Sequence, residues 1–465
     1  MHCHWRDCQA WNQESLPLST TSNEACKLYD AVLTQYVGWY DEDSVGGIET
    51  AAKKLTETDP DFVMGQVLTN GLDLIGTGRT INLDPDFKAA INTMADMATK
   101  QDITEREKQH AKAIQVWAEG DITGACHVWE DILVAHPTDM LALKFAHDSY
   151  FYLGYQPHMR DSIARVLPYW KPSMPLYGYL FGMHSFGLVE TSLYSEVEKV
   201  SRKGLELNSK DAWSTHSLAH VLEMMGRQDE GISFLSTTVR DWTTCGMLAC
   251  HNFWHWAVYH IEKGEHTGAV DIFDSEVGER CKKSGAMLDI VDACSLLYRL
   301  ELEGVNVGDR WNDVFETCRP HTDDHILAFN DVHILMSCLG AKKKDVAKEM
   351  MESIREFVKN GKGTNRDVTA EVGLPLCEAF EAYDSGDFAR AVNLLNPLRY
   401  KVLSIGGSNA QRDVFNLFLI NAALKSEDKM HHKLARCLLA ERKCLKENAP
   451  MTDRLTERAI ALHAD

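Results

Sequence analysis

The spacing of small residues around one glycine constrains this chain more than any other feature of its sequence. In four places an Ala is followed by Gly seven positions later and by a second small residue twelve positions later. Small side chains at these points allow two consecutive helices to cross closely, and the glycine permits the turn between them. The pattern predicts repeated helix–turn–helix units. They are Ala113/Gly120/Ala125, Ala219/Gly226/Gly231, Ala257/Gly264/Ala269 and Ala379/Gly386/Ala391.

Weaker units fit between the regular ones, with turns at Gly154 and near Ser192. Successive turns from Gly120 to Gly264 are therefore 34 or 38 residues apart. This is close to the 34-residue period of tetratricopeptide repeats, and Trp129 stands where such a unit has its packing aromatic. A single hairpin cannot bury its own apolar face. We therefore predict an all-α fold, a right-handed α-solenoid of stacked tetratricopeptide-like helical hairpins.

The rhythm beyond residue 264 is looser, with turns expected near Gly304 and Gly340, and the part before residue 106 shows no repeat. These changes in regularity suggest four regions along the chain. They are an N-terminal tail (1–15), an irregular N-terminal helical cap (16–105), the repeat array (106–400) and a C-terminal helical cap (401–465).

The charge balance excludes two classes of partner. The chain has 48 basic and 68 acidic residues, a formal net charge of −20. No electrostatic attraction then favours nucleic acid or an anionic membrane. No stretch approaches the roughly 20 apolar residues that span a bilayer, and the N-terminus lacks the apolar core of a signal peptide. The 13 cysteines include no CxxC pair. We expect a cytoplasmic protein with free thiols.

Six sequence blocks are more specific than the repeat pattern. They are DCQAW (7–11), LPLSTTSNEACKLYDAVLTQYV (16–37), HPTDMLALKFAHD (136–148), MLACHNFWHWA (247–257), MLDIVDACSLLYRLELEGV (287–305) and GGSNAQRDVFN (406–416). Together they resemble the tetratricopeptide repeat protein 38 family over nearly the whole chain after the first six residues. The resemblance implies a helical-repeat fold and a cytoplasmic location. It implies no catalytic residue.

Two histidine pairs are the sharpest candidate for chemistry. His216, His220 and Glu223 share one helix face, and His251 and His255 are again four residues apart one repeat later. Imidazole and carboxylate suit zinc or iron, which gives His216, His220, Glu223 and His251 as the candidate metal ligands, with His255 as the alternative to His251. The HxxxH spacing alone is a weak signal, because the chain has 20 histidines. The alternatives are polar groups lining a groove, or core histidines bonded to their neighbours.

Further polar and aromatic side chains fall at corresponding positions of neighbouring repeats. They could extend one polar stripe along a concave groove between residues 140 and 340. For the acids the alternative is a solvated face, and for the aromatics it is packing between repeats. The groove candidates are His216, His220, Glu223, His251, Asn252, Trp254, His255, Asp289, Asp292, Asn330, Asp331 and His333.

The block that begins at Gly406 opens an apolar helix. Ser408 is a reasonable N-cap, and Asn409 and Arg412 lie in the first turn or two. A helix N-terminus with a nearby arginine can hold a carboxylate or phosphate, so Ser408, Asn409 and Arg412 are a candidate anion site. The alternative is a structural cap in which Arg412 pairs with Asp413 or a neighbouring acid.

These observations favour a non-catalytic binding or scaffold protein without a cofactor. Its partner would be a peptide, a protein or a small ligand in the concave groove. The alternative is a metal-dependent or small-molecule enzyme that uses the His216/His220/Glu223 cluster with zinc or iron. Nothing in the sequence identifies a nucleophile or an oxyanion site, so the enzyme is the minority interpretation.

Overall fold

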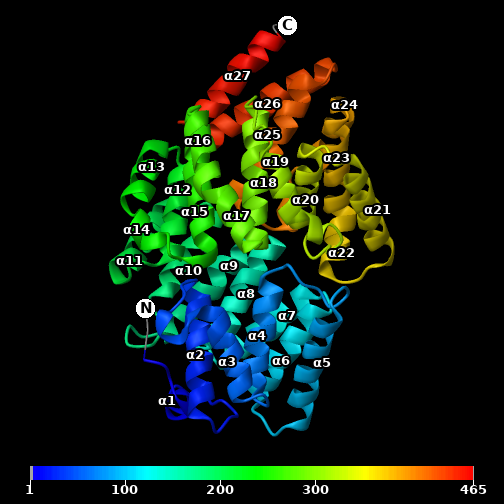
Figure 1. Cartoon of the computed structure of the whole chain (residues 1–465). Coiled ribbons are helices and arrows are strands. Elements are labelled where there is room, and N and C mark those ends of the chain that lie inside the picture. Colours follow the sequence, from blue (N-terminus) through cyan, green and yellow to red (C-terminus); the bar gives the residue numbers. More distant parts are fainter. Residues whose placement is uncertain (1–3, 464–465) are drawn as a thin grey trace. The chain divides into compact units, whose positions relative to one another are not determined.

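The computed structural model describes residues 4–463, and the chain divides into two compact units (Figure 1). The first unit contains the residues up to Ser217 together with Arg240–Ala249. The second contains Leu218–Val239 and the residues from Cys250 onward. Helices form nearly all of the regular structure, and within residues 4–463 the only β pairing is an isolated antiparallel bridge between Tyr40 and Cys245. The predicted all-α class is confirmed.

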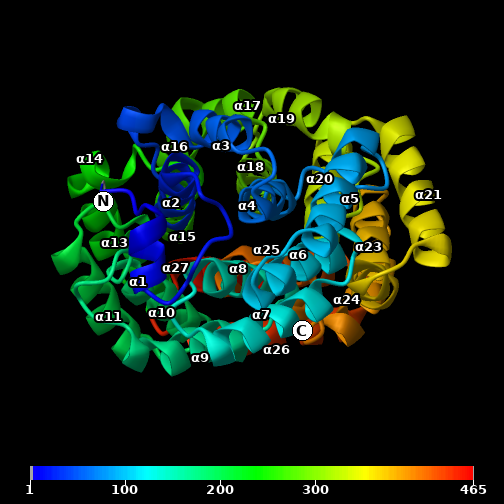
Figure 2. The same cartoon turned by 90° about the horizontal axis from the view of Figure 1, so that it is seen from below.

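In the first unit, the helices from α2 to α11 each pack on the next helix in the chain. Helices α6 to α11 follow one another side by side (Figure 2). The helices of this unit are α1 (Cys8–Gln13), α2 (Asn23–Gly38), α3 (Gly47–Thr58), α4 (Val63–Ile75), α5 (Pro85–Lys100), α6 (Glu105–Ala118), α7 (Ile122–Ala135), α8 (Met140–Leu153), α9 (Gln156–Val166), α10 (Tyr179–Glu190), α11 (Tyr194–Leu207) and the short α14 (Val239–Trp242).

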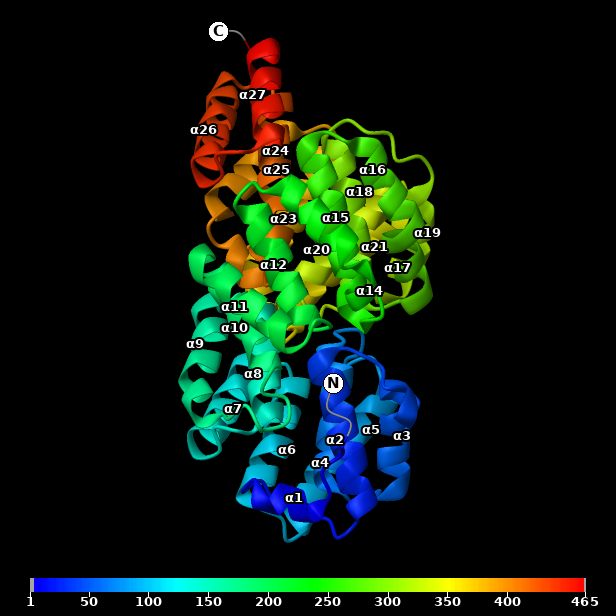
Figure 3. The same cartoon turned by 90° about the vertical axis from the view of Figure 1, so that its left-hand side faces the viewer.

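The second unit is also built mainly of helices. Helix α12 (Ala212–Met224) and helix α15 (Gly246–Lys263) begin in the first unit and end in the second. Helix α26 lies against both α25 and α27 near the C-terminal end (Figure 3). The other helices are α13 (Gln228–Thr237), α16 (His266–Ile272), α17 (Gly278–Ser284), α18 (Met287–Leu302), α19 (Arg310–Cys318), α20 (Ala328–Gly340), α21 (Lys344–Asn360), α22 (Thr364–Val368), α23 (Leu374–Asp384), α24 (Phe388–Leu395), α25 (Asn409–Lys425), α26 (Lys429–Leu445) and α27 (Pro450–Leu462).

The predicted turns lie where the repeat spacing puts them. Each turn has one residue in the left-handed region of the backbone, which glycine adopts without the steric cost of a Cβ. The φ angles are 97° at Gly120, 67° at Gly154, 61° at Ser192, 71° at Gly226, 80° at Gly264, 86° at Gly304 and 85° at Gly386.

The turn expected near Gly340 is present, two residues further on. Gly340 is the last residue of α20, and Lys342, with φ 59°, makes the turn instead. A Cβ on Gly340 would lie 2.4 Å from two ring atoms of Trp311. This glycine therefore serves close helix packing rather than the turn.

The small residues at the twelfth position also pack closely, as predicted. A Cβ on Gly231 would lie 2.4 Å from the Tyr259 ring, so α13 and α15 can approach only because this position has no side chain. Trp129 is fully buried between Trp117 and Phe145, with ring centroids 5.4 and 5.5 Å away. This aromatic packing joins α6, α7 and α8.

The helices also bear on the question of a membrane. Within residues 4–463, none combines the length and apolar character needed to cross a bilayer. The cysteines in the described part of the chain are free thiols, and most are buried.

Candidate metal centre

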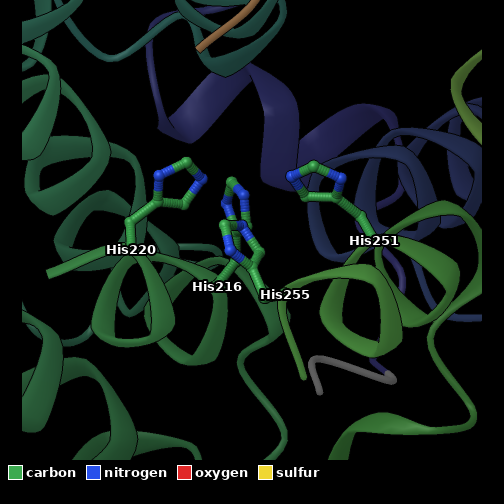
Figure 4. Close-up of side chains that lie close together, drawn as sticks. All are labelled: His216, His220, His251 and His255. Atoms are coloured by element: carbon green, nitrogen blue, oxygen red, sulfur yellow. The ribbon is translucent and has the colours of Figure 1, made fainter. Parts of the chain in front are cut away.

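Helices α12 and α15 bring four histidines together. His216 and His220 lie one turn apart on α12, and His251 and His255 lie one turn apart on α15. One ring nitrogen of each imidazole lies within 4.8 Å of the corresponding nitrogens of the other three, and all four side chains are buried. The rings point toward one another (Figure 4). His216 belongs to the first unit, but the continuous helix α12 carries it one turn before His220.

Helical periodicity explains each pair. Residues four apart on a helix are separated by about 40° around its axis, so both imidazoles of a pair leave the same face. The approach of the two pairs depends on the packing of α12 and α15. Tyr259 on α15 donates from its hydroxyl to the carbonyl oxygen of Ala219 on α12 at 2.6 Å. The centroids of the His220 and His255 rings are 4.2 Å apart.

Glu223 contacts the cluster in a different role from the one predicted. Its Oε2 atom lies 2.8 Å from Nδ1 of His255, so the carboxylate binds the outer side of an imidazole. The four-residue group contains both His251 and His255, which the sequence left as alternatives, and does not include Glu223. Of the candidate metal ligands, the structure brings together His216, His220 and His251.

His251 is bound in the same way by another acid. Its Nδ1 atom lies 2.7 Å from Oδ2 of Asp292 on α18, and the Asp292 carboxylate is fully buried. The indole of Trp254 stacks on the same imidazole, with centroids 5.1 Å apart and ring planes 8° apart. His251 is therefore held both at its edge and on its face.

Burial sets the protonation states that this arrangement favours. It lowers the pKa of His220 well below the usual value, and the neighbouring imidazoles of His255 and His251 add to this effect. Burial and the charge of His251 lower the pKa of His255 in the same direction. Neutral imidazole is the form that binds a metal ion. Burial also raises the pKa of Glu223 to about 7.

The other groove candidates are buried but lie outside the four-histidine group. Asp289 accepts a hydrogen bond from Ser284 at 2.6 Å, and His333 contacts the carbonyl oxygen of Phe329 at 2.7 Å. Asp331 pairs with His325 at 3.2 Å. Asn330 and Asn252 are buried as well, and the side-chain amide of Asn252 has no hydrogen-bond partner. Their role in binding a partner stays a prediction.

The polar groups of the candidate anion site form hydrogen bonds within the chain itself. Ser408 is the N-cap of α25, as predicted, and forms a capping box with Gln411. The Arg412 guanidinium donates to the carbonyl oxygens of Gly406 and Gly407 and to the side chain of Asn409. Asp413, one of the acids considered as a partner for Arg412, pairs with Arg442.

Sequence reasoning missed two residues that contact this region. Gln411 donates from Nε2 to Oδ1 of Asp292 at 3.3 Å, and the Arg299 guanidinium lies 5.0 Å from the centre of the Trp254 ring. Neither is near the histidines in sequence. The one available signal was the position of Gln411 in the GGSNAQR block.

No family model matches the chain. Among solved structures, it is similar to the human IFIT1 dimer with PPP-AAAA, at 12% identity over 100% of this chain and 98% of that one, with a TM-score of 0.39. The APC/C hetero-tetramer Cut9–Hcn1 gives 12% identity over 94% and 84%, with a TM-score of 0.41. Yeast Tom70 gives 12% over 80% and 92%, with a TM-score of 0.35. Similarity this low carries no argument about ligands.

Proposed function

We propose that this chain is a helical-repeat protein that binds one transition-metal ion between helices α12 and α15. The observation that supports the proposal is the four buried imidazoles, whose ring nitrogens lie within 4.8 Å of one another. The ligands of the metal ion would be His216, His220, His251 and His255.

The chemistry of the donors favours a particular class of metal. Four imidazole nitrogens suit zinc, iron, copper or nickel, whereas calcium and magnesium prefer oxygen ligands. Two imidazoles have a carboxylate on Nδ1, the arrangement that commonly supports metal-bound histidine. The carboxylates of Glu223 and Asp292 also supply negative charge close to a bound cation. When bound, the ion would supply Lewis-acid or redox chemistry.

The test is the metal content of the tag-free protein, followed by titration of the metal-free protein with Zn²⁺ and Fe²⁺. We expect one ion per chain. His220→Ala and His255→Ala should each abolish stoichiometric binding. His432→Ala, a half-buried histidine stacked on His463 instead of on the cluster, is the matched control and should retain one ion. Wild-type protein that binds neither ion would disprove the proposal.

The binding or scaffold function predicted from the sequence is kept as a separate proposal. Helical repeats commonly present extended surfaces to partners. The residues proposed to contact the partner include His220, Trp254 and Asn330, and all three are buried. Alanine variants at these positions that fold and retain every copurifying partner would contradict a groove at this place.

Two finer proposals rest on the sequence alone. The six blocks support membership of the tetratricopeptide repeat protein 38 family. The acidic charge and the free cysteines support a cytoplasmic location. Imaging of the tagged full chain in cells tests the location, and signal confined to an organelle would contradict it.

A further inference from the structure

The GGSNAQR block at the start of α25 has a role that a helix cap does not explain. Gln411 accepts from the backbone N–H of Ser408 through Oε1, at 3.0 Å, and this bond completes the capping box. Its Nε2 atom donates to Oδ1 of Asp292, at 3.3 Å. One side chain therefore joins the end of α25 to a carboxylate on α18.

The carboxyl group of Asp292 also contacts the histidine cluster. Its second oxygen, Oδ2, lies 2.7 Å from Nδ1 of His251, and the residue is fully buried. The carboxyl group of Asp292 therefore accepts from Gln411 at one oxygen and shares a hydrogen bond with the imidazole at the other. With Nδ1 bound in this way, a metal ion would have to bind His251 through its other ring nitrogen, Nε2.

A second path reaches the same imidazole from its face. The Arg299 guanidinium donates to the carbonyl oxygens of Ala410 and Gln411 in the first turn of α25, at 2.7 and 3.2 Å. It also lies 5.0 Å from the centre of the Trp254 ring, which stacks on His251. The two paths form a closed loop of contacts from α25 to His251 and back.

We infer that the first turn of α25 positions a ligand of the metal centre. Asp292, Gln411 and Arg299 are the positioning residues, and His251 is the ligand that they orient. The inference rests on the proposed metal-binding function and assigns the block a task within it. Because coupling between sites is reciprocal, a bound metal ion must also stabilise the first turn of α25.

The experiment compares metal affinity in full-length variants. Asp292→Asn keeps the volume and removes the charge on the outer nitrogen of His251. We expect Zn²⁺ affinity to fall roughly 10- to 100-fold, the usual effect of removing such a partner. Gln411→Met removes the amide and should weaken binding by about threefold to tenfold, within the lower part of that range. It also covers the case in which Asp292→Asn does not fold.

Two further measurements separate positioning from general stability. The visible absorption spectrum of bound Co²⁺ reports the ligand geometry and should change in Asp292→Asn. Backbone hydrogen exchange in the first turn of α25 should slow when Zn²⁺ binds to the wild type. In a variant that is only less stable, the Co²⁺ spectrum should remain that of the wild type, and Zn²⁺ should still slow exchange in the first turn of α25.

The controls use matched groups elsewhere. Thr104→Ala breaks the matched capping box at the start of α6. Asp331→Asn alters another buried imidazole–carboxylate pair, that of His325. Both should bind Zn²⁺ like the wild type.

The outcomes distinguish the two proposals. Wild-type affinity in both Asp292→Asn and Gln411→Met would overturn the inference while the metal site stands. Wild-type protein that binds no metal would overturn both.

Discussion

Two buried imidazole–carboxylate pairs, one in each unit, show opposite shifts in the pKa of the carboxyl group. In the first unit, Asp139 lies 3.0 Å from Nε2 of His110 and 2.8 Å from the Arg106 guanidinium. In the second unit, Glu223 lies 2.8 Å from Nδ1 of His255, and no Lys or Arg of the described chain is within ion-pair distance of it. The pairs differ in the presence of a cation.

The pKa values follow this difference. Burial alone would raise the pKa of Asp139, but His110 and Arg106 outweigh it and hold this pKa well below the usual range. For Glu223 burial prevails, and the more distant charges of Lys446 and Arg299 leave the pKa at about 7. The charge of Asp139 is balanced by Arg106 of the same chain. Glu223 contacts one of the four clustered imidazoles, and a metal ion bound by that cluster would balance its charge.

The largest expected effect is the loss of the cation in the first unit. Arg106→Met keeps much of the volume but leaves the buried Asp139 charge with only His110. We expect the free energy of unfolding to fall by about 3–5 kcal/mol, the usual cost of removing one member of a buried ion pair. Urea denaturation at neutral pH measures it. The double variant Arg106→Met/Asp139→Leu should recover most of the loss, and a single-variant loss below about 1 kcal/mol would refute the comparison.

The second effect is a pH dependence in the metal-free protein. The folded pKa of Glu223, about 7, exceeds the unfolded value of about 4.3. The folded state then binds more protons between these values, so this carboxyl destabilises the fold as pH rises through that window. Glu223→Gln does not titrate. Its stability relative to wild type should rise by roughly 3 kcal/mol from pH 4 to pH 8. Denaturation curves at several pH values test this, and a flat difference would contradict it.

The third effect is stabilisation by an external cation. Zn²⁺ at 100 times its dissociation constant should stabilise the wild type by about 2.7 kcal/mol, because it binds only the folded state. His255→Ala should show no such gain, and Mg²⁺ should not substitute because it prefers oxygen ligands. Thermal denaturation with and without a chelator measures the change. Equal stabilisation of His255→Ala would show that Zn²⁺ acts elsewhere.

The smallest effect concerns a third imidazole–carboxylate pair. His325 contacts Asp331 through Nδ1 and the Ser353 hydroxyl through Nε2, at 3.2 and 2.8 Å, so the chain itself occupies both ring nitrogens. Ser353→Ala should cost about 1 kcal/mol of unfolding free energy, the net worth of one hydrogen bond. It should leave Zn²⁺ affinity unchanged. A fall in affinity would mean that His325 acts on the metal centre.

Much of the fold could be predicted because its signals are local. A glycine with positive φ, a small residue at a helix crossing and an N-cap serine each act within a few residues. Gly120, Gly231 and Ser408 show these three cases. The turn expected near Gly340 is made by Lys342, and the close packing of Gly340 against Trp311 on a different helix has no local signal.

The candidate site was only half predictable. That His216 faces the same way as His220 follows from 3.6 residues per turn, as it does for His251 and His255. That Glu223 supports His255 instead of joining the four-histidine group depends on how α12 and α15 pack. The spacing of residues along one helix cannot specify which atom of a neighbouring helix a side chain contacts.

The sequence by itself determined the helices, their turns and the two histidine pairs, because each depends on periodicity within one segment. Only the tertiary structure decided that the pairs converge, that acids from other helices bind their outer nitrogens, and that Gln411 reaches Asp292 across 119 positions. Contacts between distant segments depend on the packing of every helix between them. No local sequence pattern specifies that combined packing.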